Sequence, residues 1–450
     1  MKSNKRPIST PILILLWVAI LLGSSLQAHA VSKRMEDPLF WISKIKDPGR
    51  LLLTPSDIQK MNEENLKRQD LLLCRAKDMK EEWIGGEILA FLKEDWKEFG
   101  KTDQVRYGKQ GIPLDDSFWN ALKENINQVA LKEKNRLLFG LTVKRTDVRV
   151  FPTAELSINT PTHYEFDLFQ HSAIAPGSLV GIYHFSRDKL WAYLQTPFIR
   201  GWIRTTDLAI ANNRSEAVVE EMVNKPLVIT GNFVRVFTDP LFHQTIFSAQ
   251  MGSTFHILHL PDWAKTSKPH YTIRIPFREA DGRLAFRNGY IPANDDIHYG
   301  FLPYTQKNLA QQAFKMLNQP YGWGEMSGGR DCSRFIMDLF NTFGILMPRN
   351  SNLQARMGTP LGSINRAVSL ATLLRMPGHI MLYLGKHEGK HYAVHSIWGI
   401  QKRGSSGIQT QKIGKVTVTD LNLGKDGPNG SLLHRLTEIQ LIGPDSEVKK

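Results

Sequence analysis

The sequence predicts an α+β fold in which a helical region and two small β modules precede a domain of helices followed by antiparallel strands. Three observations support this prediction. Apolar residues recur at helical spacing up to residue 137, short apolar segments separated by turn residues occupy residues 138–303, and two helical patterns precede strand patterns in residues 304–450. At 450 residues the chain is long for a single core, so two to four domains are expected.

The first 30 residues have the pattern of a secretory signal peptide. Three basic residues within the first six are followed by the apolar stretch 11–22 and by Ala-His-Ala at 28–30, which is a small-residue cleavage site. Cleavage would start the mature chain near Val31. An uncleaved membrane anchor is the alternative, but the apolar stretch is short for a span. We therefore expect a periplasmic or secreted protein with no stable membrane span after cleavage.

The composition restricts the classes of partner. The formal net charge of +14 suits an acidic polymer such as cell-wall carboxylates, or an anionic lipid surface. Nucleic acid is poorly supported because the charges are scattered and form no Lys/Arg-rich tract. A solvated basic surface is the alternative explanation of the charge.

The chain contains only two cysteines, Cys74 and Cys332. An exported chain that depends on disulfides usually carries more. Cys74 follows three leucines in a segment with a helical pattern, so we expect it to fill the core. A Cys74–Cys332 disulfide is the alternative, and it would make Cys332 a structural residue.

Residues 31–137 are predicted to form a helical brace that packs on the later domains. Residues 54–57, Thr-Pro-Ser-Asp, combine capping residues with a proline near the first helical turn. Apolar residues recur at helical spacing in the otherwise polar stretch 120–135. This region shows no catalytic constellation.

Residues 138–212 and 213–303 are predicted to form two related β modules. The short strands of the first fit a small half-open barrel, and a linking helix is expected at about 215–224. The sequence Val-Arg-Val-Phe occurs at 148–151 and again at 234–237, each time after a strand pattern and before a turn. This recurrence indicates a repeat.

The last segment, 304–450, contains the candidate nucleophile. Thr305 is expected to cap a first helix, and a glycine-rich loop then leads to Cys332 at the start of a second helix, with Asp331 at its N-cap. A cysteine at a helix N-terminus lies near unsatisfied N–H groups and the positive end of the helix dipole, which favours the thiolate. The alternative is a buried cysteine that serves only packing.

Two histidines can serve such a cysteine. A cysteine hydrolase needs an imidazole to take the thiol proton and a third group to orient that imidazole. Two predicted strands flank a turn at 385–389, and strand alternation places His379 and His395 on one face. A turn centred on His387 would put His395 opposite His379, within reach of an imidazole–imidazole hydrogen bond. His391, nearer the turn, is the rival third residue.

A metal site is not expected. His387, His391 and His395 would face together on a helix, but the glycines and the alternation favour a strand. On a strand, a spacing of four residues spans about 13 Å. No cofactor is expected either.

These motifs resemble the NlpC family of bacterial cell-wall cysteine peptidases, whose architecture is related to that of papain. The matching motifs are Asp-Cys-Ser at 331–333, Gly-His-Ile-Met-Leu-Tyr-Leu-Gly at 378–385, Ala-Val-His-Ser at 393–396 and Pro-Tyr-Gly-Trp-Gly at 320–324. Residues 186–207 resemble the bacterial SH3-like modules of cell-wall enzymes. The resemblance implies a papain-like catalytic domain at 304–450, preceded by two small SH3-like β-barrels, as in the multidomain branch of the family.

The resemblance also implies roles for the candidate site residues. Cys332 would be the nucleophile, His379 the general base and then the general acid, and His395 the residue that orients His379. The backbone N–H of Cys332 would help hold the oxyanion, with the Tyr321 side chain as its partner.

The resemblance finally implies a substrate. Such enzymes cut peptidoglycan stem peptides, commonly between γ-D-glutamate and the diamino acid, and an SH3-like module beside the cleft favours short turnover peptides. Asp331 and Ser333 would help bind the free amine of an N-terminal L-alanine, although Asp331 also fits the role of an N-cap alone. Many members have Gly where Arg334 stands. A non-catalytic cell-wall-binding protein, and an amidase or acyltransferase on the same fold, are the alternative functions.

Overall fold

The computed structural model describes residues 31–218, 225–264, 267–405 and 407–444. The expected signal peptide lies outside these ranges. Of the expected linking helix, the structure describes α6, Arg214–Val218. No helix within the described ranges is long and apolar enough to cross a membrane.

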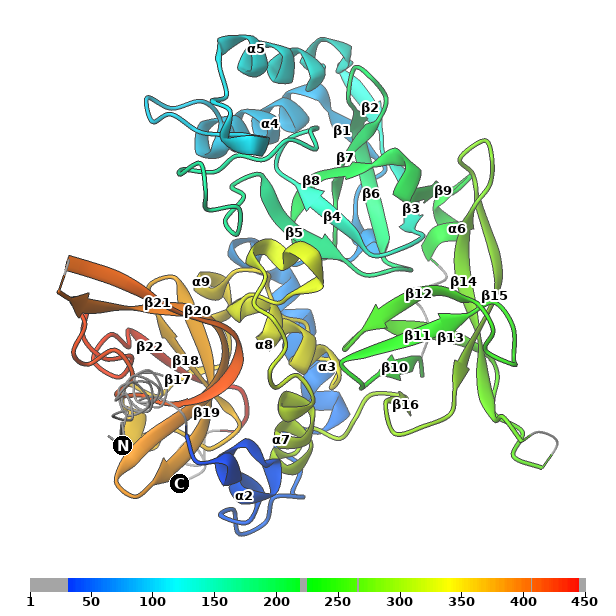
Figure 1. Cartoon of the computed structure of the whole chain (residues 1–450). Helices are drawn as coiled ribbons and strands as arrows, with labels where there is room; N and C mark the ends of the chain where they lie inside the picture. The colour runs from blue at the N-terminus through cyan, green and yellow to red at the C-terminus, as the bar shows by residue number, and fades with distance from the viewer. Residues whose placement is uncertain (1–30, 219–224, 265–266, 406, 445–450) are drawn as a thin grey trace, which may run out of the picture.

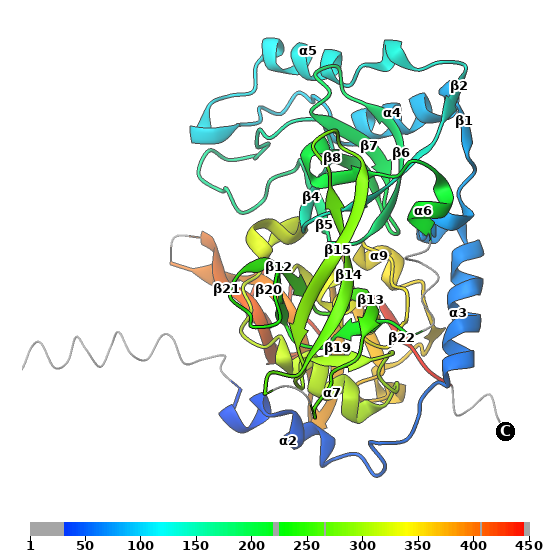
Figure 2. The same cartoon turned by 90° about the vertical axis from the view of Figure 1, so that its right-hand side faces the viewer.

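The N-terminal region is an extended arm that touches the other parts of the molecule (Figure 1, Figure 2). Its elements are α2 (Pro38–Ile42), α3 (Pro55–Lys67), β1 (Glu82–Ile84), α4 (Gly85–Phe99), α5 (Asp116–Asn125) and β2 (Lys134–Arg136). The α2 helix packs on the first helix of the last domain, and α4 and α5 cover the first β module. Thr54 and Asp57 form a capping box at the start of α3, which confirms the predicted helix start.

The predicted helix at 120–135 is wrong in its second half. The α5 helix ends at Asn125, because Asn127 adopts left-handed backbone angles with a φ of 60°. Val129, which the helical pattern placed on a buried face, is 95% exposed. The apolar spacing alone therefore did not show where the helix stops.

The two β modules have the same strand order. The first contains β3 (Leu138–Thr142), β4 (Thr146–Arg149), β5 (Gln170–Ile174), β6 (Leu179–Phe185), β7 (Trp191–Gln195), β8 (Arg200–Arg204) and β9 (Leu208–Ile210). The second contains β10 (Leu227–Ile229), β11 (Phe233–Phe237), β12 (Thr245–Gln250), β13 (Thr254–His259), β14 (His270–Arg278), β15 (Leu284–Pro292) and β16 (Ile297–Tyr299). The orders β5-β4-β8-β7-β6-β3-β9 and β12-β11-β15-β14-β13-β10-β16 are equivalent strand for strand, which confirms the predicted relation between the modules.

Neither module is the closed barrel that the term β-barrel implies, since each seven-stranded sheet stays open at its ends. The end strands β5 and β12 are directed instead toward the last domain. In β5, the backbone N–H of Ala173 donates to the Glu325 carboxylate at 2.9 Å. In β12, the Gln250 amide donates to Asp338 at 3.2 Å. In β5, a contact with another domain therefore satisfies a backbone edge group that barrel closure would otherwise satisfy, and in β12 a side chain of the edge strand makes the contact.

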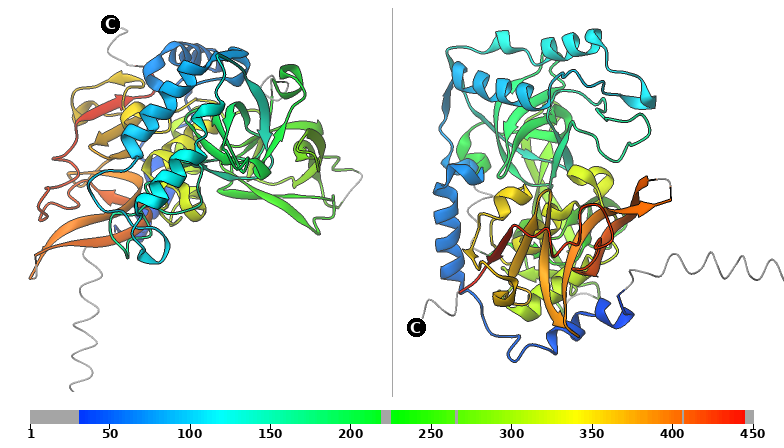
Figure 3. Two further views of the ribbon diagram at one scale, coloured as in Figure 1. Left: turned by 90° about the horizontal axis from the view of Figure 1, so that it is seen from above. Right: turned by 90° about the vertical axis from the view of Figure 1, so that its left-hand side faces the viewer.

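The last domain combines helices with an antiparallel sheet, as predicted for the α+β class. Its elements are α7 (Gln306–Lys315), α8 (Cys332–Asn341), α9 (Ser351–Gln354), β17 (Thr359–Pro360), β18 (Thr372–Met376), β19 (His379–His387), β20 (Lys390–Gly404), β21 (Gly407–Asp420) and β22 (Glu438–Leu441). The strand order is β17-β22-β18-β19-β20-β21, and α8 packs on β19 and β20. The long β20–β21 hairpin projects beyond the rest of the domain (Figure 3). Thr305 caps α7 as predicted.

Short 3-10 helices connect these elements. They are η1 (Lys33–Glu36), η2 (Gln69–Leu71), η3 (Ala76–Asp78), η4 (Lys109–Gly111), η5 (Gln128–Ala130), η6 (Thr205–Asp207), η8 (Trp323–Gly328) and η9 (Ile364–Arg366). Of these, η8 forms the loop that leads to α8.

Candidate active site

The loop before α8 is closed by two glycines that approach each other. A Cβ atom added to Gly322 would lie 2.8 Å from the Cα atom of Gly329, so neither position accepts a side chain without a backbone shift. Tyr321 and Arg330 pair across the closed loop. The helix then begins at Cys332, as the sequence predicted.

The two histidines of the predicted pair are in contact. Nε2 of His379 lies 2.6 Å from Nδ1 of His395, and both side chains are buried. His391 instead lies 2.9 Å from the hydroxyl of Tyr383. The structure therefore places His395, and not His391, against His379.

The hairpin register differs from the predicted one. The sequence predicted a turn centred on His387 and a direct pairing of His379 with His395. In the structure β19 continues to His387, which pairs with Lys390, and a bulge follows Tyr383. The turn therefore lies between His387 and Lys390. The side chains of His379 and His395 meet diagonally across the two strands instead of directly opposite each other. Their shared face was predicted correctly, because the shift preserves strand alternation.

Thr419 extends the histidine pair and was missed by the sequence analysis. Its hydroxyl oxygen lies 2.9 Å from Nε2 of His395, and it comes from β21, where it pairs with Ala393. If Nε2 of His379 carries its proton, that N–H donates to Nδ1 of His395, whose own Nε2–H donates to Thr419. This arrangement leaves Nδ1 of His379 unprotonated and able to accept a proton.

Cys332 lies beside the start of β19. A backbone hydrogen bond from Ile380, the residue after His379, reaches the Cys332 thiol. The side chain is 8% exposed. Burial, together with the Asp331 carboxylate, raises the pKa of the Cys332 thiol to about 12, although the Ile380 and Ser333 backbone groups act in the opposite direction. The Ser333 backbone N–H at the start of α8 thus favours the thiolate, as expected, but burial and the Asp331 carboxylate outweigh it.

His379 is also held in its neutral form. Burial, aided by Arg435, lowers the pKa of His379 to about 4, while Asp331 acts in the opposite direction. Burial lowers the pKa of His395 well below its usual value. The Cys332 thiol and the His379 imidazole are thus both in their neutral forms.

A connected group of aromatic side chains includes Tyr321, which lies near Cys332. Tyr321 lies 5.9 Å from Trp398, ring centre to ring centre, and Trp398 lies 5.2 Å from Phe166 of the first module. Phe166 also contacts Trp323 at 5.6 Å. Burial, with Cys332 and Asp331 nearby, raises the pKa of Tyr321 above its usual value, so its hydroxyl stays protonated and able to donate.

Asp331 has two roles in the structure. It caps α8 by accepting from the N–H of Arg334 at 2.8 Å, and it accepts from the Ser333 hydroxyl at 3.1 Å. It also forms a buried ion pair with Arg349 at 2.6 Å. Burial raises the pKa of Asp331, but the charge and hydrogen bonds of Arg349, together with hydrogen bonds from Arg334 and Ser333, bring it below its usual value, so the carboxylate is ionised.

A buried network of charges lies behind the start of α8. Arg334 pairs with Asp338 at 2.6 Å and with Glu325 at 2.9 Å, and it donates to the Ala173 carbonyl of the first module at 3.1 Å. Arg330 pairs with Asp338 at 2.7 Å. Arg334, the position at which the sequence departs from the resembled family, therefore joins α8 to the neighbouring module.

Neither Arg349 nor Glu325 was predicted from the sequence. Glu325 is fully buried and accepts from the Ser172 hydroxyl and the Ala173 N–H of the first module. Its position within a glycine-rich loop carried no periodic signal. The available signal was only that both residues are charged and lie at positions that no helix or strand pattern assigns to an exposed face.

Cys74 packs against the core that the N-terminal arm shares with the first β module. Its backbone N–H donates to the Pro197 carbonyl at 2.9 Å, and its thiol contacts the Arg75 carbonyl. No disulfide joins it to Cys332, both cysteines being among the described residues.

Comparison with known proteins identifies the domain that holds these residues. Residues 318–420 match the model of the NlpC/P60 family, and this range includes Cys332, His379, His395 and Thr419. The chain carries an NlpC/P60 domain. Residues 158–204 of the first β module match the model described as SH3 domain (SH3b1 type). The NlpC/P60 family is a family of cysteine peptidases and peptidoglycan hydrolases, so the matched residues form a cysteine peptidase domain of this kind.

Similar proteins include both curated relatives and solved structures. Dipeptidyl-peptidase 6 of Lysinibacillus sphaericus is 25% identical over 202 residues, which are 44% of this chain and 70% of that protein. The γ-D-glutamyl-L-lysine dipeptidyl-peptidase of Bacillus subtilis is 28% identical over 131 residues, which are 29% of this chain and 40% of that protein. An NlpC/P60 endopeptidase of Photobacterium damselae subsp. piscicida has the same fold, with a TM-score of 0.69 and 18% identity over 90% of this chain and 96% of that one.

Proposed function

We propose that this NlpC/P60 domain hydrolyses the bond between γ-D-glutamate and the diamino acid of peptidoglycan stem peptides that begin with a free L-alanine. Cys332 is the nucleophile in this proposal, His379 the general base and acid, and His395 the residue that orients His379. The observation that carries these roles is the hydrogen-bonded series His379, His395 and Thr419 beside a thiol at a helix N-terminus.

The proposed reaction proceeds in two steps. Nδ1 of His379 takes the thiol proton while Sγ of Cys332 attacks the γ-carbonyl carbon of D-glutamate. The Cys332 backbone N–H and the Tyr321 hydroxyl donate to the oxyanion. The proton on His379 then passes to the departing amine, leaving a thioester. A water molecule deprotonated by His379 hydrolyses that thioester and regenerates the thiol.

Substrate specificity is the finer part of the proposal. Both curated relatives are named dipeptidyl-peptidases, a name that describes release of a dipeptide from a free N-terminus. An L-Ala-γ-D-Glu unit cut before the diamino acid is such a dipeptide. The ionised Asp331, with Ser333 beside it, supplies a negative charge that would attract the terminal ammonium. Arg349 already pairs with Asp331, so the ammonium would share this carboxylate.

The central experiment compares two peptides. The purified protein is incubated with L-Ala-γ-D-Glu-diaminopimelate and with its N-acetylated form, and the products are identified by mass spectrometry. The proposal expects cleavage of the free peptide, weak or no cleavage of the acetylated peptide, and no cleavage of either by Cys332→Ala. Failure of the unmodified protein to cleave either peptide would contradict the peptidase specificity. Equal cleavage of both would contradict only the amine recognition by Asp331 and Ser333.

The orienting series has its own test. Thr419→Val keeps the shape of the side chain but removes the acceptor for His395, so the tautomer that leaves Nδ1 of His379 unprotonated is no longer favoured. We expect kcat to fall about tenfold or more while KM changes little. His395→Ala should be far less active than His391→Ala, and the reverse order would mean that His391 orients the base.

Export forms part of the same proposal, because peptidoglycan and the peptides released from it are found outside the cytoplasm. The signal-like pattern of residues 1–30 supports it. Cell fractionation and N-terminal sequencing of the mature protein test it. A protein that keeps its first residues and stays in the cytosol would restrict the substrate to imported turnover peptides.

A further inference from the structure

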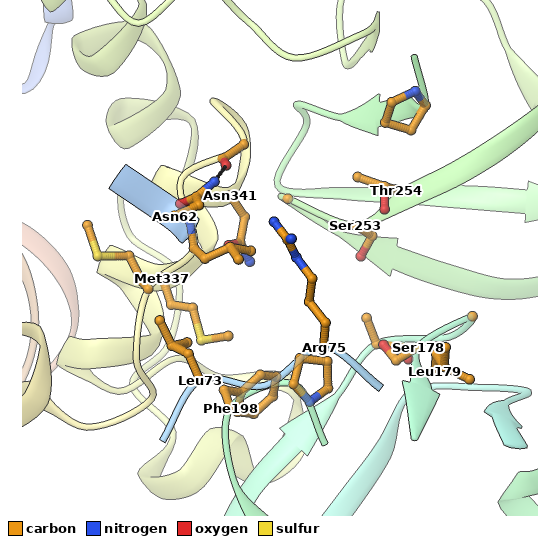
Figure 4. Close-up of a pocket in the computed structure, with 18 of the residues that line it drawn as sticks. Asn62, Leu73, Arg75, Ser178, Leu179, Phe198, Ser253, Thr254, Met337 and Asn341 are labelled. Carbon is orange, nitrogen blue, oxygen red and sulfur yellow. Dashed lines mark hydrogen bonds between the residues drawn. The ribbon is translucent and has the colours of Figure 1, made fainter. Parts of the chain in front are cut away.

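A cavity lies at the junction of the N-terminal arm, both β modules and the last domain (Figure 4). It has a volume of about 430 Å³. Its walls include Leu73 of the N-terminal arm, Phe198 of the first module, Ser253 of the second module and Met337 of α8. Nothing in the proposed peptidase mechanism uses this space.

The cavity lies on the face of α8 away from the nucleophile. A helix turns by about 100° per residue, so Met337 and Asn341 lie on the side roughly opposite Cys332. The second module closes this side at Gly252, where a Cβ atom would lie 2.6 Å from the Cβ atom of Asn341 and where φ is +81°. A glycine is therefore required for the module to approach the helix this closely. The cavity is thus separate from the peptidase site.

An arginine occupies the middle of the cavity. In Figure 4 the Arg75 side chain extends between Asn341 on one side and Ser253 and Thr254 on the other. Among the residues that the structure describes, no carboxylate pairs with this guanidinium. A partly buried, unpaired guanidinium offers five N–H donors in a fixed plane and favours an anion.

A second polar group also has no partner there. Ser253 is 7% exposed, and its hydroxyl makes no hydrogen bond to the rest of the described chain. A buried hydroxyl without a partner is costly, which makes a ligand oxygen at this position favourable. Figure 4 shows Ser253 on the wall that faces Arg75. Two independent groups from different domains thus converge on one space.

The rest of the lining is largely apolar. Leu73, Phe198 and Met337 contribute to it, together with Met347 after α8. A volume of this order is within the range of about 300–1,000 Å³ typical of pockets for organic ligands. We infer that the cavity binds a small organic anion, with a carboxylate or phosphate group held by Arg75 and Ser253 and an apolar chain against the methionines and Phe198.

The experiment uses simple probes of this chemistry. Isothermal titration calorimetry measures binding of hexanoate, hexyl phosphate and the neutral hexanamide to the purified protein. We expect saturable binding of at least one anion and binding of hexanamide at least about tenfold weaker, since a charged hydrogen bond is lost. The tighter of hexanoate and hexyl phosphate identifies the preferred head group.

Variants test the site. Arg75→Gln should weaken anion binding about tenfold or more, whereas Arg50→Gln, at an exposed position of the same arm, should not change it. Ser253→Leu should block the cavity while keeping the guanidinium, so it tests the site even if Arg75→Gln fails to fold. Absence of anion binding, equal binding of hexanamide, or unchanged binding by both cavity variants would overturn the inference. Peptide cleavage does not depend on this site, so these outcomes are independent of the proposed peptidase reaction.

Discussion

The two β modules share one strand order but act on the last domain at different points. In the first, Gln170 of β5 donates to the Gly324 carbonyl at 3.0 Å, in the loop that leads to Cys332. In the second, Gln250 of the equivalent strand β12 donates to Asp338 in the middle of α8. One repeated unit therefore contacts both the loop before the proposed nucleophile and the helix that carries it, and equivalent edge strands supply both contacts.

Loop length makes the larger difference between the modules. The connection between β4 and β5 occupies residues 150–169, whereas the equivalent connection between β11 and β12 occupies residues 238–244. Only the longer connection brings an aromatic ring, Phe166, against Trp398 beside the candidate active site. The strand order is thus common to both modules, and the longer loop gives the first module its aromatic contact with the last domain.

The largest expected effect concerns the charge that links both modules. Asp338→Ala leaves two buried arginines, Arg330 and Arg334, without this carboxylate. The free energy of unfolding should fall by about 3–5 kcal/mol, measured by urea denaturation. Asp281→Ala, which removes an exposed pair with Arg283, is the matched control and should lower the free energy of unfolding far less, because solvent screens exposed pairs. Equal losses in the two variants would mean that the buried network does not hold the modules.

The next prediction separates the two contacts. Gln170→Ala and Gln250→Ala each remove one buried hydrogen-bonding side chain, and each should lower the free energy of unfolding by about 1–3 kcal/mol. Because Gln170 supports the loop before Cys332, only Gln170→Ala should also lower kcat/KM clearly. Peptide cleavage and denaturation of both variants provide the comparison. If Gln250→Ala lowers kcat/KM as much, the two modules support the nucleophile equally.

A smaller effect is expected from the loop aromatic. Phe166→Ala removes ring contacts to Trp398 and Trp323 that are worth about 0.5–1.5 kcal/mol. We expect KM for the peptide to rise severalfold with kcat nearly unchanged. Phe242→Ala, in the equivalent loop of the second module, is the control and should leave both constants unchanged. A fall in kcat alone would show that Phe166 positions the catalytic groups rather than the substrate.

The smallest expected effect concerns pH. His379 must be neutral to accept a proton, and its lowered pKa of about 4 keeps it neutral down to mildly acidic pH. The acid limb of kcat/KM should therefore lie well below the usual histidine value of about 6.5, with activity lost as pH falls through that limb. Removing the nearby positive charge in Arg435→Gln should move the limb upward. A limb at or above 6.5 in the unmodified protein would indicate a preformed thiolate–imidazolium pair.

Local chemistry explains what the sequence predicted well. The caps at Thr54, Thr305 and Asp331 each act through residues three positions away, so their signal is complete within one helical turn. The shared face of His379 and His395 followed from strand alternation, which a two-residue change in register preserves.

Contacts between distant segments explain what the sequence did not predict. Thr419 reaches His395 from a third strand, and Arg349 reaches Asp331 from the segment after α8. Neither residue has a spacing that marks its partner. The contacts that β5 and β12 make with Glu325 and Asp338 likewise involve another domain, so no pattern within residues 138–303 could predict these contacts.

The arm formed by the N-terminal region has a consequence for the order in which the chain folds. Asn62 accepts from the N–H of Leu346 at 3.0 Å and donates to the Gly344 carbonyl at 2.8 Å, and Leu52 donates to the Tyr304 carbonyl at 2.9 Å. The arm therefore finds these partners only when the last domain, which follows it in the chain, is present. Pairings this far apart in sequence slow folding. The peptidase domain is consequently expected to complete its folding late. Removal of the arm should lower the stability of this domain more than an ordinary terminal truncation would.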